Sequence, residues 1–154
     1  MGRVLIIIYI FIILIALGTV VYFLGGISRQ TTPIRRYEYQ GSVKELVLDI
    51  SRYTKLRPNV KYFITDTIGD IKEDYAIRVS LELIANNDDT LEFDLKIEPK
   101  DKLVSTRTNV YLTKAYNKTN ISGGYQAKSE GVKTLVDFFN SDFVHNIRKL
   151  GAVE

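Results

Sequence analysis

An uninterrupted apolar segment near the N-terminus constrains this chain more than any other feature. The segment from Val4 to Leu24 contains no charged residue and is dominated by Ile, Leu, Val and Phe. Its 21 residues would rise about 31 Å as a helix, which matches a hydrocarbon core of about 30 Å. We therefore expect a transmembrane helix over residues 4–24, preceded by a tail of residues 1–3.

A cleaved secretory signal peptide is the alternative interpretation of this segment. The apolar region of a signal peptide is shorter, about 7–15 residues, and small residues surround its cleavage site. Here the apolar run is longer, and Gly25-Gly26 follows it without an A-x-A-like site. We therefore expect the segment to be retained as a single-pass membrane anchor.

The basic residues that flank the anchor give a weak indication of topology. Only Arg3 precedes the expected helix, whereas Arg29, Arg35 and Arg36 follow it. An excess of Lys and Arg favours the cytoplasmic side, so the localisation leans to a cytoplasmic domain on a single-pass membrane protein. A short tail with one Arg is also common in exported proteins, so the other side stays open. The remaining charges form no basic stripe, and nucleic acid is not an expected partner.

The rest of the chain has the pattern of one α+β domain. Residues 25–33 form a short polar linker, and residues 34–154 form the soluble domain, which the linker holds within about 30 Å of the bilayer. Alternation of apolar residues predicts an antiparallel sheet with one buried face. The expected strands are Ile34–Gln40, Val60–Thr67, Tyr75–Leu83, Leu91–Ile97 and Val104–Thr113, with a weaker one over Asn120–Gln126.

Two helices are expected to accompany this sheet. Ser42 and Glu45 fit a capping box that begins a first helix, which ends near Tyr53. A long C-terminal helix over Val132–Leu150 carries an apolar stripe and should cover the sheet. Its expected N-cap is Ser129, its expected end is Gly151, and residues 140–142 are a candidate kink.

No residue pattern indicates a catalytic, metal or cofactor site, so we expect a protein that is not an enzyme and uses no cofactor. The absence of cysteine excludes thiolate chemistry. His145 is the only histidine, and we expect it to face solvent. Gly123-Gly124 lacks the Lys and Ser/Thr of a phosphate loop and is expected at a strand junction. Turn acids, and not a calcium site, are expected at Asp66, Asp70, Glu73, Asp74, Asp88 and Asp89.

Aromatic composition is the most suggestive feature of the domain. The chain has ten tyrosines, seven phenylalanines and no tryptophan. Tyrosine combines apolar area with a polar tip, which suits the wall of an apolar cavity, a protein interface or a half-buried sheet. These three interpretations stay open for Tyr37, Tyr39, Tyr53, Tyr62, Tyr75, Tyr111, Tyr116 and Tyr125.

The order of elements resembles a START-like domain of the SRPBCC group (polyketide cyclases and lipid-transfer proteins). The residues that carry the resemblance are Tyr37–Ser42 running into Val43–Ile50, then Tyr53, Pro58 and the strand from Val60, and the closing helix over Val132–Leu150. The chain departs from this family in showing one strand fewer than the usual seven and no second short helix. The resemblance implies an apolar cavity between the sheet and the final helix, and binding of a lipid or another hydrophobic molecule. It carries over no functional residue.

Two functions follow from these observations. The first is a non-enzymatic, membrane-anchored module that binds a lipid or another hydrophobic ligand at the bilayer surface. The alternative is an accessory subunit whose domain docks on other subunits of a membrane protein complex. An enclosed cavity under the last helix would favour the first, and a filled core beside exposed apolar side chains would favour the second.

Overall fold

The computed structural model describes residues 32–68, 75–85, 87–101 and 106–153. The expected anchor, and all but the last two residues of the linker, lie outside the described residues. Within the described ranges, no helix has the length and apolar character needed to cross a bilayer. Thr32–Glu154 forms one compact unit, and its α+β class with an antiparallel sheet is confirmed.

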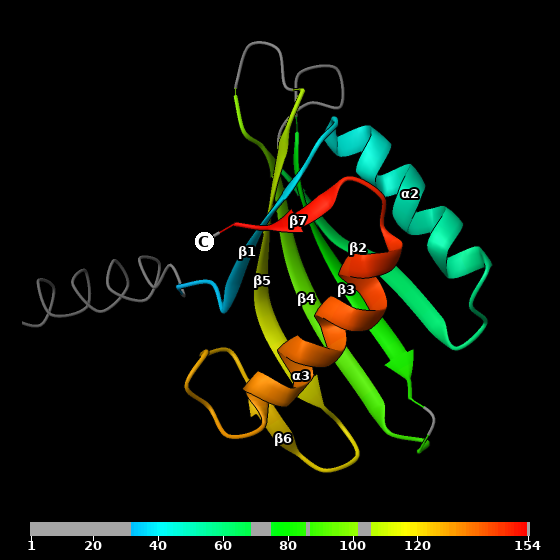
Figure 1. The fold of residues 1–154 in the computed structure, drawn as a ribbon, viewed down its shortest axis with the longest axis vertical. Helices are drawn as coiled ribbons and strands as arrows, with labels where there is room; N and C mark the ends of the chain where they lie inside the picture. The colour runs from blue at the N-terminus through cyan, green and yellow to red at the C-terminus, as the bar shows by residue number, and fades with distance from the viewer. Residues whose placement is uncertain (1–31, 69–74, 86, 102–105, 154) are drawn as a thin grey trace, which may run out of the picture. The chain divides into compact units, whose positions relative to one another are not determined.

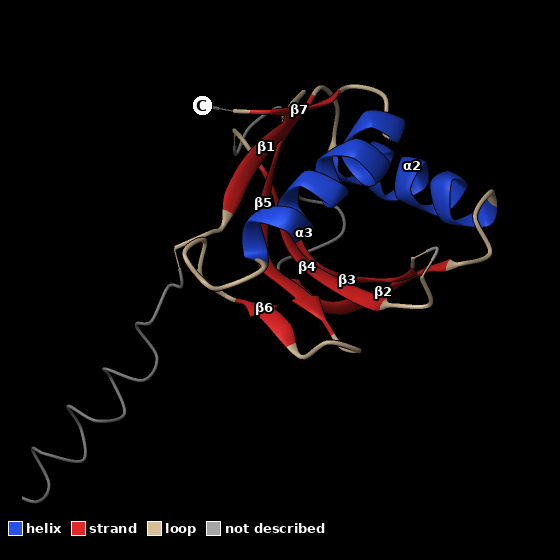
Figure 2. Cartoon of the chain, turned by 60° about the horizontal axis from the view of Figure 1, so that its bottom comes forward, coloured by secondary structure: helices blue, strands red, loops and turns tan. Residues whose placement is uncertain are grey.

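Seven strands form a single antiparallel sheet in the order β2-β3-β4-β5-β1-β7, with β6 pairing beside β5. Helices α2 and α3 both lie against the same, concave face of this sheet (Figures 1 and 2). The strands are β1 (Arg35–Tyr39), β2 (Val60–Ile68), β3 (Ala76–Ile84), β4 (Thr90–Pro99), β5 (Thr108–Asn117), β6 (Ser122–Gly124) and β7 (Leu150–Ala152). The helices are α2 (Val43–Lys55) and α3 (Val132–Phe139).

The pairing of β3 with β4 shows why alternation predicts this sheet well. Leu81 lies opposite Phe93 and Val79 lies opposite Leu95, and all four side chains are buried. The intervening residues face solvent and carry ion pairs, such as Glu92 with Lys114 on β5 at 2.8 Å. One face is therefore apolar and the other charged, as expected for an antiparallel sheet that is covered on one side.

Helix α2 begins with the predicted capping box. The Ser42 hydroxyl accepts from the Glu45 amide at 3.3 Å, and the Glu45 carboxylate accepts from the Ser42 amide at 3.0 Å. The buried side chains of the helix are Val43, Leu46, Ile50 and Tyr53. The helix ends at Lys55, slightly beyond the expected end.

The predicted bounds of the fifth strand were wrong, because a β-bulge interrupts the apolar alternation from which its second half could have been predicted. The strand β5 runs over Thr108–Asn117 and not over Val104–Thr113. Leu112 pairs with Leu95 and Lys114 pairs with Asp94, so that Thr113 is the extra residue. The bulge reverses the inward and outward alternation, and the apolar pattern of the sequence therefore breaks in the middle of the strand.

The C-terminal helix is shorter than predicted. After α3 the chain makes a π-helical turn η1 (Asn140–Val144), which lies at the expected kink. The N-cap is Gly131 with φ +78° and not Ser129.

The end of the chain is a strand and not the last turn of a helix. Leu150 pairs with Tyr39 in β7, and the left-handed residue that precedes this strand is Lys149 with φ +70°, not Gly151. The predicted helix to Leu150 was wrong because Leu150 matches the helical stripe by spacing but is buried against the sheet. With β7 the sheet has seven strands, so the expected shortage of one strand was also wrong.

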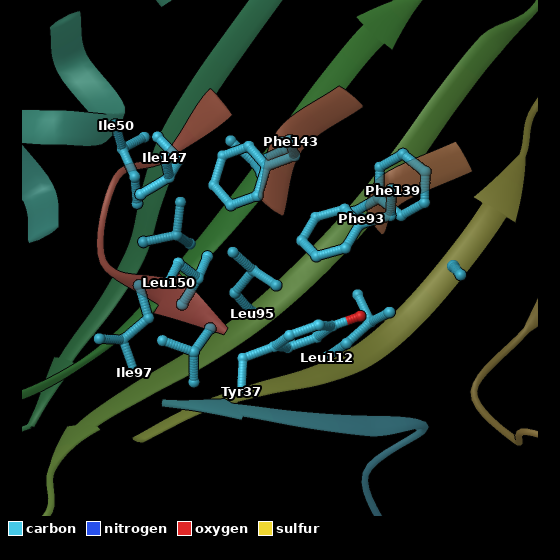
Figure 3. Packing of buried hydrophobic residues seen from close by; sticks show 14 of the residues in the cluster. Tyr37, Ile50, Phe93, Leu95, Ile97, Leu112, Phe139, Phe143, Ile147 and Leu150 are labelled. Atoms are coloured by element: carbon cyan, nitrogen blue, oxygen red, sulfur yellow. The ribbon is translucent and has the colours of Figure 1, made fainter. Parts of the chain in front are cut away.

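A chain of aromatic rings joins the helices to the sheet (Figure 3). The Phe139 ring lies 5.0 Å from Phe93, 4.9 Å from Phe143 and 5.7 Å from Tyr37, measured between ring centroids. Tyr53 of α2 meets Phe143 edge-on at 5.4 Å. Each such pair contributes about 0.5–1.5 kcal/mol beyond area burial, so these contacts fix the positions of both helices.

Gly123 lies where the backbone of β6 approaches two neighbours closely, which agrees with the expected strand junction. Its φ is +99°, and a methyl group on its Cα would lie 2.3 Å from the Ala115 carbonyl oxygen and 2.8 Å from Leu135 Cδ1. Only glycine fits both the backbone conformation and the space.

We predict that Gly123→Ala lowers the free energy of unfolding by about 3 kcal/mol, because it adds backbone strain and overpacking. Gly151→Ala is the matched control, since no atom lies within 4 Å of the added methyl group, and it should change stability by less than about 0.5 kcal/mol. Urea denaturation followed by circular dichroism measures both. Equal losses for the two variants would contradict the close approach at Gly123.

Candidate functional site

The space between the final helix and the sheet is filled by side chains. The cavity there measures about 10 Å³ and is lined by residues such as Leu81, Phe93 and Phe143. A single water needs about 10–15 Å³. In the described residues, this position therefore holds no chamber of the size that the START-like resemblance implies.

A larger recess lies on the surface, between α2 and the segment that follows η1. This groove has a volume of about 630 Å³, within the range of small-molecule and peptide sites. Tyr39 and Tyr53 are almost fully buried and form its base. The other lining residues are Glu45, Leu48, Asp49, Arg52, Leu56 and Arg57 from α2 and its end, and Asn146, Ile147, Arg148 and Lys149 from the C-terminal segment. We call this surface the α2 groove.

Two phenol–carboxylate hydrogen bonds make the base of the α2 groove rigid. Tyr39 donates to Asp49 Oδ2 at 2.7 Å, and Tyr53 donates to Asp142 Oδ2 at 2.5 Å. Burial raises the pKa of each of these two tyrosines, and the hydrogen bond to a carboxylate raises it further. Arg57 pairs with the second oxygen of Asp142, so that this carboxylate joins the end of α2 to the π-helical turn.

The acidic side chains of the α2 groove are already engaged, whereas two of its basic ones are not. Glu45 accepts from the Ser42 amide, and Asp49 accepts from Tyr39 and also pairs with Arg52 at 3.0 Å. Arg148 and Lys149 are exposed, and neither side chain has a partner among the residues that the structure describes. The groove therefore offers two free cations.

Two exposed apolar side chains line the same groove as these cations. Leu48 is 50% exposed and Leu56 is 83% exposed. Both leucines therefore leave much of their apolar surface in contact with solvent. Together with Arg148 and Lys149 they form a surface that can bind a ligand with both negative charge and apolar area.

Lys149 adds a strained backbone to this surface. Its φ of +70° lies in the left-handed region, where a side chain costs about 1–2 kcal/mol. The conformation is held because the Gln40 amide donates to the Lys149 carbonyl at 3.0 Å and the Leu150 amide donates to the Ile147 carbonyl at 3.2 Å. A lysine in this conformation is uncommon.

The residues that the sequence singled out do not assemble into a site. His145 is exposed, as predicted. Asp66 and Asp88 are exposed, whereas Asp89 accepts hydrogen bonds from the side-chain amides of Asn87, Asn117 and Asn120. Asp70, Glu73 and Asp74 lie outside the described residues.

Sequence reasoning did not find the α2 groove. The sequence did contain an indication of it. Leu48 is an apolar residue outside the buried stripe of α2, and Leu56 is an apolar residue directly after the helix. The contribution of residues 146–149 gave no signal, because they were expected to continue a helix. Comparisons with protein-family models, with curated proteins and with solved structures found no match for this chain.

We predict that Tyr53→Phe lowers the free energy of unfolding by about 1–2 kcal/mol at neutral pH, because Asp142 loses a hydrogen bond to a charged acceptor. The raised pKa of Tyr53 also contributes stability that is fully present below the unfolded-state pKa of about 10 and is lost as the pH rises above it. Urea titrations at pH 7 and pH 11 should show that wild type loses more stability between these two values than the variant does.

Tyr125→Phe is the control for this experiment, because its ring is 55% exposed. It should leave the stability at pH 7 unchanged, because the Tyr125 hydroxyl makes no hydrogen bond within the residues that the structure describes. An equally steep alkaline loss in Tyr53→Phe and in wild type would contradict the role given to the Tyr53 hydroxyl.

Proposed function

We propose that this chain is a membrane-tethered, non-enzymatic accessory subunit whose domain binds an acidic, partly apolar segment of a partner membrane protein in the α2 groove. The single observation that carries the proposal is the pairing of free cations with exposed leucines around an open groove, above an interior that is filled. The expected helix over residues 4–24 supplies the tether, and the bilayer is the second partner.

The length of the groove suits a short peptide segment. Eleven residue steps separate Glu45 from Leu56, the C-cap of α2, which is a rise of about 16 Å. An extended partner segment covers this length with about five residues. Such a segment would alternate an apolar residue against Leu48 or Leu56 with a carboxylate against Arg148 or Lys149. Burying a leucine contributes about 1.5–3 kcal/mol, and the charge pairs give orientation and specificity.

Binding of a lipid or hydrophobic ligand is the second function considered, because Arg148 and Lys149 would also attract an anionic headgroup. An acyl chain needs apolar enclosure as well as this charge. The region under α3 is filled by aromatic side chains, and the α2 groove is lined by charged residues as well as leucines. These features favour a peptide segment over a lipid.

The deciding experiment is purification of the intact chain from its native membranes in mild detergent, with mass spectrometry of the co-purifying lipids and proteins. A stoichiometric membrane protein and no consistent lipid supports the proposal. A consistent lipid with no protein partner contradicts it and supports the ligand-binding alternative.

We predict that the double variant Arg148→Glu/Lys149→Glu lowers the yield of the co-purified partner by about tenfold or more, because two attractive contacts become repulsive. The measurement is the partner-to-bait ratio in the same purification. Lys128→Glu/Lys133→Glu is the matched control, since both lysines are exposed and do not line the groove. A similar loss in the control would show that net charge, and not the α2 groove, determines binding.

A further inference from the structure

The turn between β5 and β6 presents an apolar side chain on a strained backbone. Ile121 has φ +52°, which is the left-handed region that β-branched residues avoid. Its side chain is 78% exposed, so burial in the domain does not compensate for this strain. An exposed isoleucine that destabilises its own turn indicates a contact outside the domain.

A hydrogen-bond network keeps this turn in place. The Asn117 side-chain oxygen accepts from the Thr119 amide at 2.9 Å and from the Asn120 amide at 3.0 Å. The Asn117 and Asn120 side-chain amides both donate to Asp89, at 2.9 and 3.0 Å. The Thr119 hydroxyl accepts from the Thr90 amide at 3.0 Å. The turn is therefore rigidly attached to the start of β4, and it holds Ile121 in the strained conformation.

The turn lies at the end of the sheet toward which the N-terminal end of β1 points, because β1 and β5 are antiparallel. Arg35, at the start of β1, pairs with Leu112, and β5 continues from there for five residues to Asn117, or about 17 Å. Figure 1 shows β6 and its turn at the end of the sheet away from the start of α2. Leu24 and Thr32 are eight residues apart, so the linker holds Thr32 within about 28 Å of Leu24.

The surroundings of Ile121 suit a lipid interface. Tyr125, just past β6, is 55% exposed, and the Lys114 ammonium lies 5.6 Å from the centre of its ring. Tyrosine is a common residue at the level of the lipid headgroups. Lys118 is paired with Glu82 at 2.8 Å. Lys128 and Glu130 are both exposed and carry opposite charges. The contact expected here is therefore apolar and does not require anionic lipid.

We propose that Ile121 inserts into the bilayer that holds residues 4–24 and that Tyr125, on the other side of β6, lies at the headgroup level. The domain then has a second membrane contact, which fixes its orientation relative to the bilayer. This inference depends on the membrane anchor in the proposed function and not on the α2 groove.

The composition of the chain makes a direct test possible, because the sequence contains no cysteine. Ile121→Cys in the full chain, labelled with an environment-sensitive fluorophore and reconstituted in nanodiscs of phosphatidylcholine, reports on this site alone. We expect a blue-shifted emission that is quenched by lipids carrying a spin label on the acyl chain. Lys44→Cys, exposed near the start of α2, is the matched control and should show neither effect.

Each other outcome identifies what has failed. An unshifted emission from labelled Ile121→Cys in chains that remain in the nanodisc overturns the membrane contact and leaves the anchor intact. Loss of the chain from the nanodisc overturns the anchor and this inference with it. A blue shift that acyl-chain quenchers do not reduce, and that requires a bound protein, overturns the lipid contact in favour of a protein interface.

The variant Ile121→Asn distinguishes a membrane contact of Ile121 from a role in the stability of the turn. Asparagine tolerates the left-handed conformation, so this variant should raise the urea midpoint of the protein. It should also abolish the blue shift of a fluorophore placed at Tyr125→Cys in the same chain. A lower urea midpoint, or an unchanged shift at position 125, would show that Ile121 has a structural role and would overturn the inference.

Discussion

The stacked pair Phe139–Phe143 is the contact on which the rest of the domain depends. It lies at the junction of α3 with the π-helical turn, and its rings contact Phe93 of the sheet and Tyr53 of α2. Because both helices meet at this pair, the position of one sets the position of the other. In the same turn, Asn140 accepts a hydrogen bond from the Tyr37 hydroxyl and Asp142 accepts one from the Tyr53 hydroxyl. The base of the α2 groove is fixed as a consequence.

The same contacts account for three of the ten tyrosines of the chain. Tyr37, Tyr39 and Tyr53 place their rings in the core and their hydroxyls on acceptors in the helices. Burial raises the pKa of Tyr37 to about 12, so this hydroxyl remains a donor at an alkaline pH where an exposed tyrosine ionises. Tyr37 and Tyr39 thereby attach the π-helical turn and α2 to the sheet, and Tyr53 attaches α2 to the π-helical turn.

The sequence predicted elements whose pattern is regular and local. The Ser42–Glu45 capping box needs only four residues, and the strands β3 and β4 alternate without a bulge. The second half of β5 was not predicted, because the extra residue Thr113 reverses the alternation. Strand β7 was not predicted, because Leu150 fits a helical stripe as well as a strand. The α2 groove joins residues about a hundred positions apart, a pairing that periodicity does not encode.

The two neighbours of strand β1 determine how the strand resists a pulling force. It lies between β5 and β7, and the Val153 amide donates to the Arg36 carbonyl at 3.2 Å near the entry of the chain. The hydrogen bonds of both ladders run across the strand, so tension along β1 from its N-terminal end loads them all in shear at once. A pulling force between the domain and the segment before β1 would therefore be resisted by all these hydrogen bonds together. They would not break one after another.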